Sequence, residues 1–465
     1  MPDKTLNYFT RISNIPRPSG MEKGVMEYLV NFAKDHNLEY YTDSTHNVII
    51  KKPSNRQNCN KTLILQAHTD MVCEKDGDVD FDFLTEGIKL KTEDDFLMAE
   101  GTTLGADNGI GLCMILSILD DDNLDIPNLE CLFTAQEETT MLGAINADFS
   151  KLKGEHLLSI DGTDEAKIEV SSAGMKVFKY SRTFETSPLK KDSNIYKLKL
   201  SGLRGGHSGS EINTNRRNAI KLLFELIKSY KDVKIIGLSG GGKSNAIPRE
   251  CECVFSCDRA YSELQTISKN FVLTHKTVEP DFIVKLETLT CDNAQYLQKS
   301  DELIDFICSH KNGVLEYDKE NTTFPLISNN LANISLTENE VDIIISLRSS
   351  IVKLEEQYIN EINTNAKNYG FDNVLLNSAP FFEKKENSYL QNLCKTSYES
   401  LFDKEAVIEG VHAGLEGGVF ASKKKGLDIC VIAPNIFDAH SPKERVSLTS
   451  IFRVYKWLER IIKEF

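Results

Sequence analysis

The first third of the chain alternates between helical spacing of hydrophobic residues and short, continuous hydrophobic runs. Apolar side chains recur every three or four positions over residues 25–32 and again over 110–118, which predicts two amphipathic helices. The continuous runs predict buried strands, and they are HNVII (46–50), TLILQ (62–66), LECLFTAQ (129–136) and HLLSID (156–161). Because helices and buried strands alternate, we expect an α/β fold with a mixed, mostly parallel sheet that helices cover on both faces.

The pattern changes near Ser187, where the predicted strands become half-polar. The segment NIYKLKLSG alternates apolar and polar residues, and helical spacing follows over 214–230. A strand-helix-strand-strand-helix-strand series results, and we expect a looser second version between residues 282 and 376. Buried-strand runs return towards the end of the chain in AVIEG and LDICVIAP, and the last predicted helix covers residues 447–465.

These changes divide the chain into three segments. Residues 1–185 and 382–465 share the alternating α/β pattern, whereas residues 186–381 have the half-polar pattern of an α+β domain. We therefore expect one discontinuous α/β domain, built from both ends of the chain and interrupted by an inserted domain.

The composition is that of an ordinary globular protein. Of the 465 residues, 40% are hydrophobic and 26% are charged, which excludes collagen-like and wholly disordered classes. The net charge of −15 repels phosphate backbones and anionic lipids, so we expect neither a nucleic acid nor a membrane as a partner. No hydrophobic run approaches the ~18 residues of a membrane span, and the first residues lack the pattern of a secretion signal. The 11 cysteines form no facing CxxC pairs, which predicts free thiols in a cytoplasmic protein.

Histidines and carboxylates gather just after the predicted strands, where open α/β sheets place their sites. His68 precedes Asp70 by two residues, so one ring nitrogen can bind a metal while the carboxylate accepts the other N–H. A capped turn is the simpler alternative for this pair. Asp107 and Asn108 lie between glycines ahead of a helix, where an N-cap is the simpler alternative.

Three further positions follow other strands. Glu137 and Glu138 are adjacent, and side chains of successive residues in extended backbone point to opposite faces. One of them can therefore ligate a metal while the other holds a water, although two solvated glutamates would look the same. Asp161 and His440 come after two more strands, and each alone fits a turn or an ordinary polar residue.

Taken together, these strand-end positions of one sheet offer two imidazoles and three carboxylates. This mixture suits zinc, manganese or cobalt with open coordination positions, whereas calcium takes oxygen ligands and structural zinc prefers cysteine. The residues themselves therefore predict a hydrolase site with two metal ions.

Seven motifs resemble those of the aminoacyl-histidine dipeptidase (peptidase D) family, in the group of di-zinc peptidases that includes carnosinase and carboxypeptidase G. Over nearly the whole chain they are LQAHTDMVCEKD, EGTTLGADNGIG, AQEETTMLGA, LSIDGTDE, GLRGGHSGSEI, GVHAGLEGG and DAHSPKERV. One residue departs from the pattern, because Gly417 stands where relatives tend to have cysteine. The resemblance implies a metallo-dipeptidase whose α/β domain is catalytic and whose insert is a lid or dimerisation domain, so a homodimer is one expectation.

The resemblance also implies which residues would bind the two metal ions. Each of two ions would be held by one histidine and one carboxylate, and a further carboxylate would bridge both. His68 and Asp161 would hold one ion, Glu138 and His440 the other, and Asp107 would be the bridge. Zinc is the expected metal, with manganese and cobalt as alternatives.

In the same family, a water that bridges the metals attacks the peptide carbonyl. Glu137 would be the general base and later the acid, and Asp70 would orient His68. The peptide bond between Asp107 and Asn108 would be cis. The reaction would be hydrolysis of the peptide bond of unblocked dipeptides, including Xaa-His dipeptides.

Four residues are candidates for holding the substrate. By resemblance, His207 in the GGHSG segment would donate a hydrogen bond to the oxyanion. Asn245 and Arg348 are candidates for gripping a carboxylate, since arginine offers a bidentate fork, but each is equally an ordinary loop or strand-edge residue. Glu416 lies where the family presents a loop to the substrate end, and its carboxylate would suit a free amine.

Other functions fit part of the pattern. An N-acyl-amino-acid deacylase or an aminopeptidase would share the metal ligands and differ only in its pocket residues. A catalytically silent, peptide-binding relative would have lost ligands, yet every proposed ligand is present. A cysteine hydrolase would need a Cys-His arrangement with a family signature, which we do not find.

Overall fold

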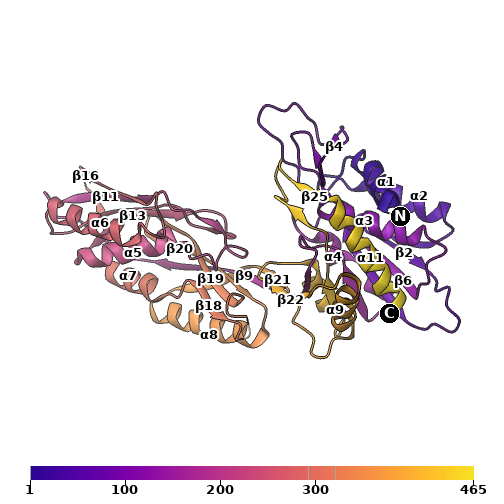
Figure 1. Cartoon of the computed structure of the whole chain (residues 1–465). Helices are drawn as coiled ribbons and strands as arrows, with labels where there is room; N and C mark the ends of the chain where they lie inside the picture. Colours follow the sequence, from indigo (N-terminus) through magenta and orange to yellow (C-terminus); the bar gives the residue numbers. More distant parts are fainter. Residues whose placement is uncertain (1, 292, 320) are drawn as a thin grey trace. The chain divides into compact units, whose positions relative to one another are not determined.

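The computed structural model describes residues 2–291, 293–319 and 321–465, so Met1, where the predicted first segment begins, lies outside the described residues. The chain divides into two compact units, whose elements are labelled in Figure 1. The first unit contains the described residues up to 172 together with 382–411 and 415–465. The second unit contains residues 173–381 and the triplet 412–414.

The triplet 412–414 belongs to the second unit although its flanking residues belong to the first. His412 Nε2 lies 2.7 Å from Ser328 Oγ. The carbonyl of Ala413 accepts a 3.0 Å hydrogen bond from the amide of Ala173. These bonds attach the triplet to the second unit.

The first unit is built on an eight-stranded sheet. In spatial order its strands are β1 (Glu39–Thr42), β2 (Val48–Lys52), β6 (Asn128–Thr134), β3 (Thr62–His68), β7 (His156–Ser159), β23 (Asp428–Val431), β8 (Lys167–Ser172) and β22 (Val407–Val411). β3 runs parallel to β6 and β7, β7 to β23, and β8 to β22. The β1·β2, β2·β6 and β8·β23 pairs are antiparallel. This mixed, mostly parallel sheet confirms the predicted fold class.

Helices bury their apolar side chains against both faces of this sheet. One core contains α1 (Pro2–Ser13), α2 (Lys23–Asp35), α3 (Ala106–Leu119), α9 (Tyr389–Phe402) and α11 (Leu448–Glu464), and the other contains α4 (Leu142–Asn146) and α10 (Glu416–Lys423). Adjacent strand residues point to opposite faces, so Leu63 and Leu65 of β3 lie in the first core and Ile64 lies in the second. Smaller elements are η1 (Phe149–Lys151) and the sheet of β24 (Ile436–Phe437), β25 (Arg445–Ser447), β5 (Phe96–Ala99) and β4 (Leu90–Glu93).

The second unit is built on a nine-stranded sheet. Its strands are β16 (Ile283–Leu289), β11 (Ile195–Ser201), β15 (Cys251–Ser256), β13 (Lys234–Gly241), β19 (Pro325–Thr337), β20 (Glu340–Ser349), β9 (Gly174–Thr183) and β21 (Asp372–Ala379), with β18 (Gly313–Tyr317) paired to β19. Its helices are α5 (Ala219–Tyr230), α6 (Tyr261–His275), α7 (Ser300–Ser309) and α8 (Val352–Asn368). Two small ladders join β10 (Thr186–Pro188) to β17 (Gln295–Leu297) and β12 (Gly206–His207) to β14 (Ala246–Ile247).

The large sheet of the second unit has two halves with the same connectivity. One half is β11-α5-β13-β15-α6-β16, and the other is β9-α7-β19-β20-α8-β21. In each half the first strand lies between the third and the fourth, and the halves join through β13 and β19. Each half thus has the ferredoxin-like arrangement. The second strand-helix-strand-strand-helix-strand series is therefore present. Its first strand, β9, precedes the whole of the first series in the chain.

The position of β9 also changes the first domain boundary. β9 pairs with β20 and with β21 over most of its length, so its backbone hydrogen bonds lie within the second unit. The first segment of the first unit therefore ends at residue 172, whereas the sequence pattern places this boundary at residue 185. At the other boundary, residue 381 belongs to the second unit and residue 382 to the first.

Two predictions about the chemistry of the whole chain can be compared with the structure. The described cysteines other than Cys291 are free thiols, as predicted. Among the described residues, no helix is both long and apolar enough to cross a membrane.

Candidate active site

The carboxyl ends of three parallel strands in the first unit bring the predicted ligands together. β3 ends at His68, β7 ends two residues before Asp161, and β6 ends three residues before Glu137. Because β3 runs parallel to both neighbours, these ends meet at one edge of the sheet. Asp107 comes from the first turn of α3, and His440 comes from the segment after β24.

The predicted ligand atoms form two clusters that share Asp107. His68 Nε2 lies 3.2 Å from Asp107 Oδ1 and 3.4 Å from Asp161 Oδ1. His440 Nε2 lies 3.3 Å from Asp107 Oδ2 and 3.1 Å from Glu138 Oε1. Two ligands of a tetrahedral zinc ion, each bound at about 2.0–2.1 Å, are about 3.3 Å apart. The observed separations therefore suit one cation in each cluster.

The charge of the site also favours cations. Among the described residues, the imidazoles of His68 and His440 interact with six carboxyl groups. These carboxyl groups belong to Asp70, Asp107, Glu137, Glu138, Asp161 and Glu416. Burial raises the pKa of Asp161 well above its usual range, whereas the hydrogen bonds that the His440 ring donates to Asp107 and Glu138 raise the pKa of His440 to about 11. Glu138 Oε1 is buried and faces His440 Nε2 at 3.1 Å. Imidazole and carboxylate are ligands of zinc, manganese and cobalt, so this donor set fits a pair of divalent ions.

Asp70 holds the imidazole of His68 and the turn after β6. Its Oδ1 lies 3.3 Å from His68 Nδ1, and its carboxylate accepts a 2.7 Å hydrogen bond from Ser19 Oγ. It also accepts hydrogen bonds from the backbone amides of Glu137 and Glu138, at 3.0 Å and 3.1 Å. Burial alone would raise the pKa of Asp70, but these hydrogen bonds lower it to about 2. With Nδ1 facing this carboxylate, Nε2 of His68 is left to bind a cation.

The peptide bond between Asp107 and Asn108 is cis, as the resemblance implies. Asn108 Nδ2 donates a 2.8 Å hydrogen bond to Asp161 Oδ1. The alternative interpretation of these two residues as an N-cap is wrong, because the residue before α3 is Gly105 and the helix has no side-chain cap.

Two buried charged residues that the sequence pattern did not indicate hold the loop before Asp107. Arg17, which is 2% exposed, donates to the carbonyls of residues 69–70 and of Gly105. The carboxylate of Glu444, also 2% exposed, accepts the consecutive amides of residues 104–107. Gly105 has a φ of +69°, in the left-handed region that favours glycine. Both partners are distant in sequence from this loop, so no local spacing could reveal them.

Two more buried carboxyls lie beside the ligands. Burial raises the pKa of Glu137 well above its usual range, against the opposing charge of His68. Glu416 is 1% exposed, and its Oε2 accepts Gln66 Nε2 at 2.6 Å and Thr134 Oγ1 at 2.7 Å. Burial raises the pKa of Glu416 to about 7. A carboxyl with a raised pKa can both accept and release a proton near neutral pH.

The second unit holds His207 in one tautomer. His207 ends β12 and pairs with Ala246 of β14. Its Nδ1 accepts the backbone amides of Gly209 at 3.3 Å and Ser210 at 3.2 Å. Because Nδ1 is an acceptor, the neutral ring carries its proton on Nε2. Burial and then the charge of Arg348 lower the pKa of His207, so the ring is neutral and offers Nε2–H as a donor.

Arg348 on β20 is a buried cation that forms no ion pair with the residues that the structure describes. It is 5% exposed, and its Nε has no hydrogen-bond partner among the described residues. Burial alone lowers its pKa to about 10. An unpaired buried charge is costly, so this site favours an anionic ligand. Asn245 is exposed, and its backbone carbonyl accepts a 2.8 Å hydrogen bond from the backbone amide of Ser208.

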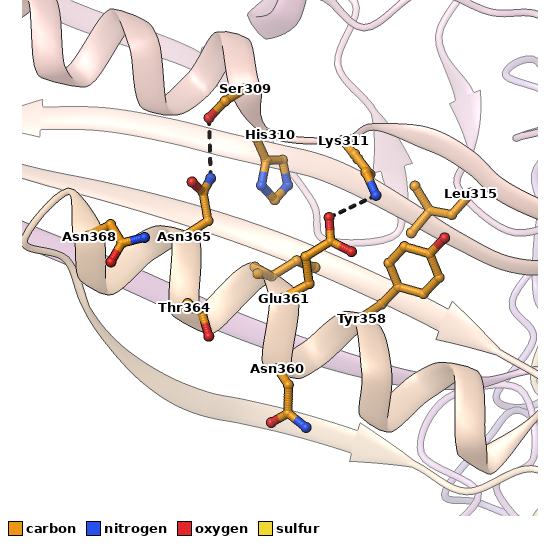
Figure 2. A pocket seen from close by; sticks show the side chains of 11 residues that line it. Ser309, His310, Lys311, Leu315, Tyr358, Asn360, Glu361, Thr364, Asn365 and Asn368 are labelled. Carbon is orange, nitrogen blue, oxygen red and sulfur yellow. Dashed lines mark hydrogen bonds and ion pairs between the residues drawn. The ribbon is translucent and has the colours of Figure 1, made fainter.

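A separate cavity of about 470 Å³ lies in the second unit between α8 and the turn after α7. Figure 2 shows its side chains, including the 2.7 Å ion pair of Lys311 with Glu361 and the 3.2 Å hydrogen bond from Asn365 to Ser309. His310, which is 3% exposed, also lines it. None of the predicted site residues lines this cavity.

Comparisons with known proteins agree with this arrangement. The model of Peptidase family M20/M25/M40 matches residues 64–464. The Cytosol non-specific dipeptidase of Escherichia coli is 31% identical over 100% of this chain and 98% of that protein. The crystal structure of Aminoacylhistidine Dipeptidase from Vibrio alginolyticus superposes with a TM-score of 0.90 and 28% identity, covering 100% of this chain and 97% of that one.

A more distant structure shares the fold. Aminopeptidase PepT from Bacillus cereus has a TM-score of 0.59 and 15% identity, covering 100% of this chain and 98% of that chain. The family model and the full-length relative, together with the paired clusters at the sheet edge, lead to one conclusion. The chain belongs to peptidase family M20/M25/M40.

Proposed function

We propose that this protein is a metallo-dipeptidase that hydrolyses the peptide bond of unblocked dipeptides, including Xaa-His dipeptides. The observation that carries this proposal is the pair of imidazole–carboxylate clusters that share the two oxygens of Asp107. The similarity to proteins named cytosol non-specific dipeptidase and aminoacylhistidine dipeptidase supports the substrate class. A cytoplasmic location is part of the proposal, supported by the free thiols.

Two divalent cations would be held by the five clustered ligands. His68 and Asp161 would hold one, Glu138 and His440 the other, and Asp107 both. Zinc is the proposed metal, and manganese and cobalt accept the same ligands. When bound, such a pair supplies Lewis acidity towards the peptide carbonyl and acidifies a shared water.

Glu137 is proposed to move the proton in this reaction. Its carboxyl would accept a proton from the attacking water and pass it to the departing amine. The raised pKa of Glu137 suits the second step, in which the group must be an acid near neutral pH. The amide of Glu137 donates to Asp70, so the same carboxylate positions both the base and His68.

Contacts at both ends of the substrate would select dipeptides. Glu416 would bind the free α-amine, because its Oε1 is buried and has no partner within the described residues. Arg348 would bind the terminal carboxylate, with Asn245 as a second donor. His207 would donate Nε2–H to the oxyanion. The first unit is thus proposed as the catalytic domain and the second as its lid; the expected homodimer remains a prediction.

The test couples metal analysis to a substrate panel. The purified protein should contain two divalent ions per chain and cleave free dipeptides, and chelation should abolish cleavage until metal is restored. Full activity without a bound divalent ion would contradict the proposal. Cleavage of N-acetyl amino acids in place of dipeptides would indicate the deacylase, and cleavage of long peptides the aminopeptidase.

The Glu137→Gln variant tests the proton transfer. We expect kcat to fall by about 10²–10⁴ with metal content unchanged, because the amide cannot carry the proton. Glu100→Gln, which changes an exposed glutamate of the same unit, should keep wild-type kcat. Near-normal turnover of Glu137→Gln would exclude this role.

A further inference from the structure

The side chain of Gln66 connects the three strands whose ends carry the ligands. Gln66 is 0% exposed and lies on β3, two residues before His68. Its Oε1 accepts Ser159 Oγ of β7 at 2.6 Å, and its Nε2 lies 3.1 Å from Thr134 Oγ1 of β6. The same Nε2 donates to Glu416 Oε2, at the start of α10, at 2.6 Å.

These partners determine how the amide of Gln66 is oriented. The group of Gln66 that faces Glu416 is the amide NH₂, which donates a hydrogen bond to Glu416 Oε2. The carbonyl oxygen therefore faces Ser159, whose hydroxyl donates to it. Thr134 Oγ1 in turn donates to Glu416 Oε2 at 2.7 Å. Every hydrogen bond in this group has one donor and one acceptor.

The result for Glu416 is an asymmetric carboxylate. Its Oε2 accepts two hydrogen bonds, from Gln66 and Thr134. Its Oε1 is buried and accepts none from the described residues. Two donors on one oxygen fix the plane of the carboxylate, and they leave the other oxygen for an external cationic donor.

We propose that Gln66 is a positioning residue for the substrate amine: it holds Glu416 so that Oε1 faces the ammonium group of an unblocked dipeptide. This inference rests on the proposed amine-binding role of Glu416. It predicts that Gln66 affects binding of the free amine and leaves the chemical step and the metals alone. If Gln66 only held the strands together, its loss would instead disturb the proposed ligands at the ends of β3 and β7.

The experiment compares variants of the full-length, metal-loaded enzyme. Gln66→Met keeps the length of the side chain and removes the amide, and Thr134→Val removes the second donor to Glu416. Gln298→Met removes a similar amide in the second unit, where Nε2 donates to Ser187 Oγ at 2.9 Å, and serves as the control. For each variant we would measure metal content, kcat and KM for Ala-His, and the inhibition constant of N-formyl-Ala-His, which lacks the ammonium charge.

We expect Gln66→Met to raise the KM for Ala-His about tenfold, the effect of losing one charge-assisted hydrogen bond. Its kcat, its metal content and the inhibition constant of the formyl peptide should stay within about twofold of wild type. Thr134→Val should also raise the KM for Ala-His. If Gln66→Met does not fold, the KM of Thr134→Val tests the proposal instead. In a Glu416→Gln background, Gln66→Met should cause no further loss, because both changes act on one interaction.

The outcomes separate the two proposals. If Glu416→Gln leaves the KM for Ala-His unchanged, the amine-binding role of Glu416 is wrong. If Glu416→Gln raises this KM but Gln66→Met and Thr134→Val do not, the positioning role of Gln66 is wrong. Loss of metal or of kcat in Gln66→Met would also overturn the positioning role, because it would show a structural tie.

Discussion

Replacing Glu444 by glutamine tests how the loop of the bridging ligand is held. Glu444 Oε2 accepts the amides of Leu104 at 2.8 Å and Gly105 at 2.9 Å. Its Oε1 accepts the amides of Ala106 at 2.8 Å and Asp107 at 3.3 Å. Burial raises the pKa of Glu444, so the carboxylate is tolerated there only with these donors. Glutamine keeps the shape but replaces one oxygen by an NH₂ group, which cannot accept.

The size of the effect follows from the number of amides left without an acceptor. Whichever way the new amide group turns, one pair of consecutive backbone N–H groups faces NH₂. A buried donor without an acceptor costs about 1–3 kcal/mol, so the free energy of unfolding should fall by roughly 2–6 kcal/mol. If the loop moves to avoid this cost, Asp107 moves with it, and both proposed metal positions lose the carboxylate that is proposed to bridge them.

The assay combines urea unfolding with metal analysis by mass spectrometry. Glu444→Gln should unfold at lower urea, bind metal more weakly, or both. Glu250→Gln is the matched control, because Glu250 is an exposed glutamate paired to Lys199 and its loss should change stability by about 0.5 kcal/mol or less. If Glu444→Gln matched this control in stability and retained both metals, the four amide contacts would not hold the loop and the reasoning would be refuted.

Three further predictions concern the second unit. Arg348→Ala should raise the KM for dipeptides about 10- to 100-fold without loss of stability, since the guanidinium has no counter-charge to lose in the described chain; an unchanged KM would exclude it from carboxylate binding. His207→Ala should lower kcat by about 10²–10³ with metal content preserved, as measured by steady-state kinetics and metal analysis. His310 lines the cavity of Figure 2, and burial lowers its pKa from 6.5 to about 3, so only the unfolded chain takes up this proton between those values. Stability from His310 is therefore complete above pH 6.5 and is lost as the pH falls, by roughly 2 kcal/mol at pH 5. Urea unfolding at pH 5 and pH 8 should show a smaller difference for His310→Gln than for wild type, and equal differences would contradict this.

The strand-end positions of the candidate ligands could be predicted because the hydrophobic pattern locates the strands. His68 and Asp161 lie at or just after runs of buried residues, and parallel strands place such ends together. The pattern contains no information about Glu444 or Arg17, since their partners come from distant segments and differ in residue type. Gln66 is hidden for another reason: it lies inside a buried strand, where a polar residue has no periodic signal.

The missed boundary has a physical explanation as well. β8 and β9 are separated by only Ala173, so the chain changes sheets without a turn or a linker that composition could reveal. β9 also mixes buried and partly exposed positions irregularly, unlike the half-polar alternation of β11. The helix α1 shows the opposite case, because Tyr8, Phe9 and Ile12 have helical spacing and its existence could have been predicted.

The triplet 412–414 limits how this protein can be taken apart. An excision of residues 173–381 would remove Ser328 and Ala173, which are the hydrogen-bond partners of His412 and Ala413. The triplet, which lies just before Glu416, would then lose these two hydrogen bonds. A chimera that grafts the insert of a relative would have to carry over this triplet too. The insert therefore depends on a stretch of chain about 30 residues beyond its own end.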